Sequence, residues 1–344
     1  MILASRVQAE LMVGNKAPKL QTGKWIQGEP VVGFDSNHIY VVEFWATWCG
    51  PCVGSIPHLN QLWEKFKDKS VIVVGVDVWD SDETVAPFVK KMGTNMTYRV
   101  ALDDKSQNED GFMSATWWPR KTNHHGIPTA FIINRDGTIA WIGHPMGLKE
   151  EILDQIVSGK YDLAKATTDY QKDFETNQKF QDAQSRLYAA MRAKKWDEAE
   201  AVLKEIDVMF PNWTNGFATA RLQVLLGKKN FSSAFQLADS LSKLHSTSDG
   251  MQNSLAWTIA TSESPDEHCL GLAKTIAERS VQLTQSTNSA SLDTLARVQF
   301  MLGKKSDAVA TEEKAVGMED DIREKSSLEK TLAAYRAGRL PEAN

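Results

Sequence analysis

The motif Cys-Gly-Pro-Cys at residues 49–52 constrains this chain more than any other feature. Residues 39–45 before it form a short, nearly continuous apolar run, which is typical of a strand buried on both faces. The segment that follows, residues 51–68, is predicted to be a helix. Two cysteines three residues apart at the start of a helix place their sulfur atoms side by side on its first turn. The sequence therefore predicts a reactive dithiol between a strand and a helix.

The two cysteines are expected to have different roles. Unpaired N–H groups and the positive end of the helix dipole favour the ionised form of a thiol at a helix N-terminus. We expect the outer residue, Cys49, to attack a disulfide and Cys52, one turn further in, to resolve the mixed disulfide that results. Pro51 lies in the first turn, where it removes no helical hydrogen bond.

Cysteine usage excludes a disulfide-rich fold, because the chain of 344 residues has only three cysteines. The third, Cys269, lies among leucine and alanine on a predicted helix and is expected to be a buried thiol.

A zinc site at the two active-site cysteines would need a second pair of ligands, for which His124 and His125 are the candidates. We expect these histidines to shape a substrate groove or tune the thiolate, and we expect no metal. Binding of copper or zinc is the alternative.

The composition is that of an ordinary globular protein, with 24% charged residues, 42% hydrophobic residues and a formal net charge of −5. A slightly acidic chain lacks the basic surface that nucleic acid or anionic lipid requires, so we expect neither as a partner. No apolar run is long enough to span a membrane.

Residues 1–10 do not form a complete signal peptide. Because residues 7–9 resemble the end of a cleavage site, we interpret this segment as the remnant of a leader.

Glycine and proline divide the chain into two parts. Eight of the 11 prolines and 14 of the 21 glycines lie before residue 160. Frequent breakers between short apolar runs predict an α/β domain over residues 11–160. Their scarcity later in the chain predicts an all-helical domain over residues 175–344. Residues 161–174 are polar and charged and are predicted to be a linker.

The first domain is predicted to combine a strand–helix–strand unit with a hairpin. Residues 71–77 are a second short apolar run, and a right-handed crossover should make this strand parallel to the first. Residues 129–134 and 138–143 predict a hairpin, and residues 148–157 predict a closing helix. The expected fold is a central mixed sheet flanked by helices.

The second domain contains a repeat. Similar short segments that open a helix surround Ala199, Ala234 and Ala308. The first two alanines are 35 residues apart, and the longer interval that follows leaves room for one more repeat around residues 269–272. This period resembles that of degenerate tetratricopeptide repeats, which implies stacked helix pairs that offer a concave surface to a peptide or protein.

The segment around the cysteines, residues 42–52, closely resembles the active-site segment of the thioredoxin superfamily, in particular of the extracytoplasmic TlpA/ResA-type thiol–disulfide oxidoreductases. Residues 14–18 and 126–132 match two further motifs of that family in the right order. The resemblance covers residues 10–160 and implies a thioredoxin-like fold with a cis peptide bond between Ile127 and Pro128. It also implies a substrate groove formed by Trp48, Gly50, Pro51, Ile127, Pro128 and Thr129.

Glu43 occupies the position at which thioredoxins carry a buried acid that accepts a proton from the resolving cysteine. The resemblance therefore implies that Glu43 is a general base. Its neighbours on both sides are apolar, and a buried carboxylate without a task is costly. The alternative is a partly solvated glutamate at a strand edge with a structural role only.

The resemblance implies thiol–disulfide oxidoreductase activity, and we expect a reductase, because Gly-Pro between the cysteines is also the dipeptide of thioredoxin. We expect no cofactor beyond the Cys49–Cys52 pair, a protein disulfide as substrate, an upstream thiol as electron donor, and repeats that recruit a partner. The alternative is an interaction module in which redox chemistry is secondary. The pattern Pro-x-x-x-Thr-x-x-Cys of peroxidases with the same fold does not occur. We expect an exported protein that acts outside the cytoplasm, with a cytoplasmic location as the alternative.

Overall fold

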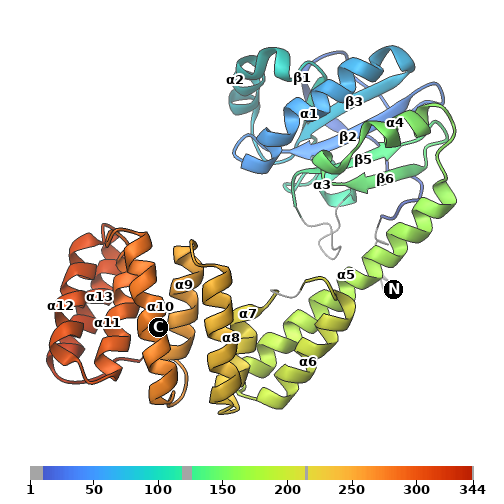
Figure 1. Ribbon diagram of the computed structural model, residues 1–344. Helices are drawn as coiled ribbons and strands as arrows, with labels where there is room; N and C mark the ends of the chain where they lie inside the picture. Colours follow the sequence, from blue (N-terminus) through green and yellow to red (C-terminus); the bar gives the residue numbers. More distant parts are fainter. Residues whose placement is uncertain (1–10, 118–125, 214–215, 343–344) are drawn as a thin grey trace, which may run out of the picture. The chain divides into compact units, whose positions relative to one another are not determined.

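The computed structural model describes residues 11–117, 126–213 and 216–342. The chain separates into two compact units, residues 1–178 and 179–344, which we call the sheet unit and the helical unit (Figure 1). Helix α5 (Leu163–Arg192) contains the division between them. None of the helices in the described ranges combines the length and the apolar character that a membrane crossing requires.

The described part of the sheet unit contains one mixed sheet of six strands in the order β1-β4-β3-β2-β5-β6. Strands β2, β3 and β4 are parallel to one another, and the other strands pair antiparallel. β2 and β3 lie at the centre because their apolar sequences suit burial on both faces. The strands are β1 (Thr22–Gln27), β2 (Ile39–Trp45), β3 (Val71–Asp77), β4 (Arg99–Asp103), β5 (Thr129–Ile133) and β6 (Ile139–Gly143).

Helices cover both faces of the sheet (Figure 1). Helices α1 (Gly50–Phe66), α2 (Asp82–Met92) and α4 (Glu150–Val157) contribute to the apolar core on one face. Helix α3 (Phe112–Trp117) and the first turns of α5 contribute to the core on the other. The predicted fold class, a central mixed sheet flanked by helices and followed by an all-helical region, is confirmed.

Strand β2 decides which side chains meet α1. Successive residues of a strand point to opposite faces, so the odd-numbered residues from Ile39 to Trp45 face α1 and the even-numbered residues from Tyr40 to Phe44 face α3. Glu43 is odd-numbered. Its carboxyl group therefore points into the layer that also contains the first turns of α1.

The linker expected at residues 161–174 is not observed as an irregular segment, because residues 163–174 form the first part of α5. The sequence is polar, but Leu163, Ala166 and Tyr170 recur at helical spacing and pack against the core of the sheet unit. One apolar stripe on an otherwise polar segment is enough to anchor a helix, which then continues into the helical unit as far as Arg192.

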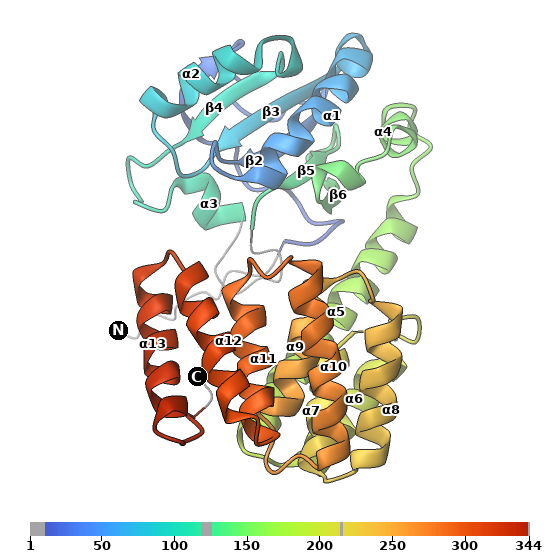
Figure 2. The same cartoon turned by 60° about the vertical axis from the view of Figure 1, so that its left-hand side comes forward.

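The helical unit repeats a simple pattern of helix, short turn and helix. A residue with a left-handed backbone lies in four of these turns, at Lys194, Lys229, Ser264 and Gly303. The intervals are 35, 35 and 39 residues, so the helix pair around residues 269–272 fills the expected gap. The helices are α6 (Trp196–Met209), α7 (Ala218–Gly227), α8 (Phe231–Leu244), α9 (Asp249–Ala260), α10 (Glu267–Leu283), α11 (Ser289–Met301), α12 (Lys305–Met318) and α13 (Ile322–Arg336) (Figure 2).

Each of these turns is followed, five residues later, by a small buried side chain. The side chains are Ala199, Ala234, Cys269 and Ala308, all at most 1% exposed. Cys269 thus occupies the packing position that alanine fills in the other helix pairs. Burial raises its pKa to about 12, in keeping with the predicted buried thiol.

Candidate active site

Cys49 and Cys52 form a disulfide with an S–S distance of 2.04 Å at the start of α1. Cys49 is the N-cap residue, and its sulfur accepts a hydrogen bond from the backbone N–H of Cys52 at 3.2 Å. The Cys49 side chain is 6% exposed and that of Cys52 is fully buried. An attacking group outside the protein can therefore reach Cys49 more readily than Cys52.

The loop before β5 lies against the Cys49 sulfur. The sulfur is 3.8 Å from the carbonyl oxygen of Ile127, and the peptide bond between Ile127 and Pro128 is cis. The hydroxyl group of Thr129 donates to the carbonyl oxygen of Gly126 at 2.7 Å and so closes this loop. The structure thus brings Ile127 to the dithiol from 78 positions away in the sequence. His124 and His125 lie outside the described residues.

Trp48, Gly50 and Pro51 are exposed around the buried sulfur atoms. Trp48 is the largest of them, and 65% of its surface is accessible to solvent. Together with Ile127, these residues make up the rim through which a substrate would approach Cys49.

Glu43 is fully buried on β2, with strand β3 on one side of it and β5 on the other. The alternative of a partly solvated glutamate at a strand edge is therefore excluded. Burial raises the pKa of Glu43 to about 8, although hydrogen bonds from Tyr98 and Ser55 lower it. A carboxyl group with such a pKa is mostly protonated near neutral pH and can exchange its proton there.

Ser55 connects Glu43 to the helix that carries the cysteines. Its hydroxyl group lies 2.9 Å from the carbonyl oxygen of Cys52 and 3.4 Å from a carboxyl oxygen of Glu43. The hydroxyl group is the donor in both contacts, so its single proton is shared between the carbonyl oxygen of Cys52 and the carboxyl group of Glu43 and lies closer to the former. The acid is in this way linked through one hydroxyl group to the backbone of the resolving cysteine.

Gly75 lies next to Glu43 on the adjacent strand. A Cβ atom at this position would lie 3.0 Å from the Tyr98 ring and 3.1 Å from the indole nitrogen of Trp45. Both distances are tighter than ordinary carbon contacts, so the absence of a side chain at Gly75 lets the two rings approach the strand.

Two aspartates that the sequence analysis missed support the active-site loop. Asp80 Oδ2 accepts hydrogen bonds from the backbone N–H and from the hydroxyl group of Thr47, both at 2.8 Å. Asp77 Oδ1 accepts from the backbone N–H groups of Trp79 and Asp80 at 3.1 and 2.8 Å. Burial raises the pKa of Asp77 to about 7. The signal available in the sequence was an aspartate that ends a β-branched run, where a buried carboxyl group needs such partners.

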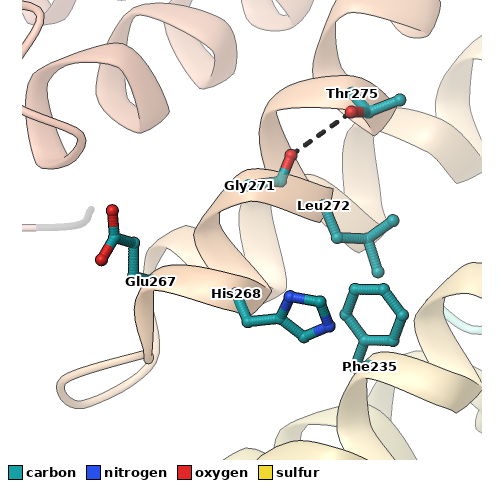
Figure 3. Close-up of a pocket in the computed structure, with 6 residues that line it drawn as sticks. All are labelled: Phe235, Glu267, His268, Gly271, Leu272 and Thr275. Atoms are coloured by element: carbon teal, nitrogen blue, oxygen red, sulfur yellow. Dashed lines mark hydrogen bonds between the residues drawn. The ribbon is translucent and has the colours of Figure 1, made fainter.

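The helical unit carries a surface groove between α8 and α10 (Figure 3). The ring of His268 stacks on the ring of Phe235 with their centroids 4.0 Å apart. Leu272, Gly271 and Thr275 continue the groove along α10 (Figure 3). Over the described residues, no group of three or more His, Cys, Asp or Glu side chains is arranged to hold a metal ion.

Comparison with known proteins finds relatives for most of the sheet unit. Residues 13–142 match the model of the AhpC/TSA family. Protein FixW of Rhizobium leguminosarum is 27% identical over 210 residues, which cover 57% of this chain and 90% of FixW. The thiol-disulfide oxidoreductase ResA of Bacillus anthracis is 29% identical over 134 residues, 38% of this chain and 68% of ResA.

Among solved structures, a putative thiol:disulfide interchange protein DsbE from Chlorobium tepidum is 27% identical. The match covers 44% of this chain and 99% of that one, with a TM-score of 0.32. The family match, the sequence relatives and the geometry around Cys49 and Cys52 agree. Residues 13–142 therefore form a thioredoxin-like domain of the AhpC/TSA family type, and its curated relatives include thiol-disulfide oxidoreductases.

Proposed function

We propose that this protein is a disulfide reductase that acts on protein substrates through Cys49 and Cys52. The observation that carries the proposal is the placement of Cys49 at the N-cap of α1 and against Ile127, on a helix whose Ser55 contacts a buried acid, Glu43. The helix N-terminus stabilises a thiolate on Cys49. Gly-Pro between the cysteines, as in thioredoxin, supports the reducing direction.

In the proposed reaction the Cys49 thiolate attacks one sulfur of the substrate disulfide. The substrate disulfide breaks, one substrate thiolate leaves, and a mixed disulfide forms between Cys49 and the substrate. Cys52 then loses its proton to Glu43, in those molecules in which the Glu43 carboxyl group is ionised, and attacks the sulfur of Cys49. This step releases the second substrate thiol and leaves the Cys49–Cys52 disulfide, so two electrons have passed to the substrate. An upstream dithiol reduces the protein again, and no further cofactor takes part.

Insulin, whose reduction produces a visible precipitate, tests this proposal. Reduced protein should reduce insulin, and Cys49→Ser should abolish the activity. Cys269→Ala is the matched control, because it also removes one thiol but at a buried alanine-like position, and it should retain full activity. Cys52→Ser should accumulate a mixed disulfide with the substrate. Turnover by Cys49→Ser at the wild-type rate would contradict the proposal.

The proposal assigns partner recruitment to the helical unit and places the protein outside the cytoplasm. Stacked helix pairs present grooves to peptides, and the groove at Phe235 and Leu272 supports this assignment. The resemblance to TlpA/ResA-type proteins supports the location. A photo-crosslinker introduced at Thr275 should capture a partner protein. Wild type should reduce the disulfide of this captured protein faster than the variant Leu272→Asp does. Equal rates of reduction by wild type and Leu272→Asp would contradict the assignment of partner recruitment to the helical unit. Recovery of the protein from the cytoplasm alone in cell fractionation would contradict the location outside it.

A further inference from the structure

Two exposed tryptophans stack beside the redox-active cysteine. The rings of Trp48 and Trp79 lie with centroids 5.5 Å apart and an angle of 18° between their planes. Trp48 directly precedes Cys49, whereas Trp79 lies in the loop between β3 and α2. Their side chains are 65% and 47% exposed, whereas Trp45 and Trp117 in the same unit are buried. We call Trp48 and Trp79 the tryptophan pair.

Hydrogen bonds fix the two segments that carry the tryptophan pair. Asp80, directly after Trp79, holds the N–H and hydroxyl groups of Thr47, directly before Trp48. Asp77 accepts a hydrogen bond from the N–H of Trp79, and Lys105 donates to the Trp79 carbonyl oxygen at 3.1 Å. The loop is thus ordered without any contribution from a substrate. A surface that is ordered in advance binds with a smaller loss of conformational entropy.

The position of the tryptophan pair relative to Cys49 determines what can cover it. Trp48 adjoins the residue that forms the mixed disulfide, so a substrate bonded to Cys49 holds its neighbouring residue close to these rings. Consecutive Cα atoms lie only about 3.8 Å apart. A small disulfide without neighbouring residues presents nothing to the pair, whereas a polypeptide disulfide always does. Aromatic rings gain from contact with an exposed indole through offset and edge-to-face packing, in addition to the apolar area that they bury.

We propose that Trp79, together with Trp48, selects polypeptide disulfides in which an aromatic residue adjoins the cysteine attacked by Cys49. This inference rests on the proposed function and specifies the substrate class of the same site. Trp79 is then a specificity-determining residue that lies 30 positions from Cys49 in the sequence and touches the substrate through its ring.

Two synthetic peptides test the inference on the full chain. Each is closed by one disulfide, and they differ only in having phenylalanine or alanine beside both cysteines. Reduced wild type should show a roughly two- to tenfold higher kcat/KM for the phenylalanine peptide. Trp79→Ala should bring the ratio close to one, and Trp79→Phe should keep most of the preference. Bis(2-hydroxyethyl) disulfide, which has no neighbouring residue, should be reduced equally by wild type and both variants.

Trp213→Ala is the matched control, because Trp213 lies in the helical unit and is 48% exposed, nearly the same as Trp79. It should leave the peptide ratio unchanged. If wild type reduces both peptides equally, or if Trp79→Ala slows the small disulfide as much as the phenylalanine peptide, the inference is wrong while the proposed function stands. If wild type reduces none of the three disulfides, the proposed function fails, and the inference fails with it.

Discussion

The hydroxyl group of Tyr98 donates a hydrogen bond to the carboxyl group of Glu43 at 3.0 Å, and both side chains are fully buried. Tyr98 lies just before β4, two strands away from Glu43 on β2, so the contact spans β3. This donor favours the ionised form of Glu43, whereas burial opposes it more strongly. The balance leaves an acid that titrates near the pH at which a thiol exchanges its proton.

Replacing Glu43 should make stability less dependent on pH. The folded-state pKa of about 8 lies above the ordinary value of 4.5, so the folded protein binds a proton that the unfolded chain releases. The free energy of unfolding of wild type therefore falls as pH rises from 4.5 to about 8. Glu43→Gln lacks this term. The free energy of unfolding of Glu43→Gln, relative to that of wild type, should therefore rise by roughly 4 kcal/mol between about pH 5, where the two are similar, and about pH 9.

Urea unfolding followed by tryptophan fluorescence at several pH values measures this difference. Asp77, whose pKa is also raised by burial, contributes a fall of the same sign, but it is present in both proteins and cancels. The exposed Glu151 on α4 provides the control, and Glu151→Gln should keep the wild-type pH dependence. Parallel curves for wild type and Glu43→Gln would mean that Glu43 is ionised throughout.

The same substitution should slow the second chemical step but not the first. Cys52 is fully buried, which disfavours its thiolate, so the step that needs this thiolate depends on a nearby base. In Glu43→Gln, resolution of the mixed disulfide should slow by roughly a hundredfold, and the initial attack by Cys49 should change little. Stopped-flow fluorescence of Trp48 reports both phases. Equal slowing of the two phases would argue for a distorted site rather than a missing base.

Asp80 should contribute to stability through Thr47. Asp80→Ala removes the acceptor of two hydrogen bonds and should lower the free energy of unfolding by about 2 kcal/mol. Asp68→Ala, which removes an exposed carboxylate, serves as the control and should have little effect. Denaturant unfolding measures both values. A loss in Asp80→Ala no greater than that in the control would show that water replaces the two bonds.

Cys269 should behave as an alanine-sized core residue with no chemistry of its own. Cys269→Ala should change the free energy of unfolding by less than about 1 kcal/mol, because alanine fills the same position in the other helix pairs. In the reduced wild-type protein, a thiol reagent should modify Cys49 under native conditions and the buried Cys269 only after denaturation. Rapid native labelling of Cys269 would contradict the packing described here.

Residues close together in the sequence were the easiest to predict. The apolar runs that form β2 and β3 stand out, and the helix after β2 begins within one residue of its predicted start. By contrast, β1 is only half-buried at the sheet edge and shows no clear alternation. The polar start of α5 predicts a linker, because its few apolar residues matter only once the sheet unit offers them a surface.

The site residues that belong to one local sequence motif could be predicted. Those that reach the site only because two strands pair side by side could not. Cys49, Cys52 and Glu43 lie within ten residues of one another. Trp79 and Asp80 reach the active-site loop because β2 and β3 are parallel and in register, which places Trp45 beside Asp77. No pattern within residues 71–80 indicates that register, since it depends on how the two strands pack beneath α1.

Gly75 shows how a residue without a functional group can set the chemistry of its neighbours. The space its missing side chain leaves is occupied by the edges of the Tyr98 and Trp45 rings. A methyl group there would lie closer to both rings than ordinary contacts allow, so at least one ring would have to shift by a few tenths of an ångström. The pKa of Glu43 thus depends in part on the absence of a side chain at Gly75 on the adjacent strand. A shift of the Tyr98 ring would alter the hydrogen bond that lowers the pKa of Glu43, so one carbon atom on β3 can act on the acid without touching it.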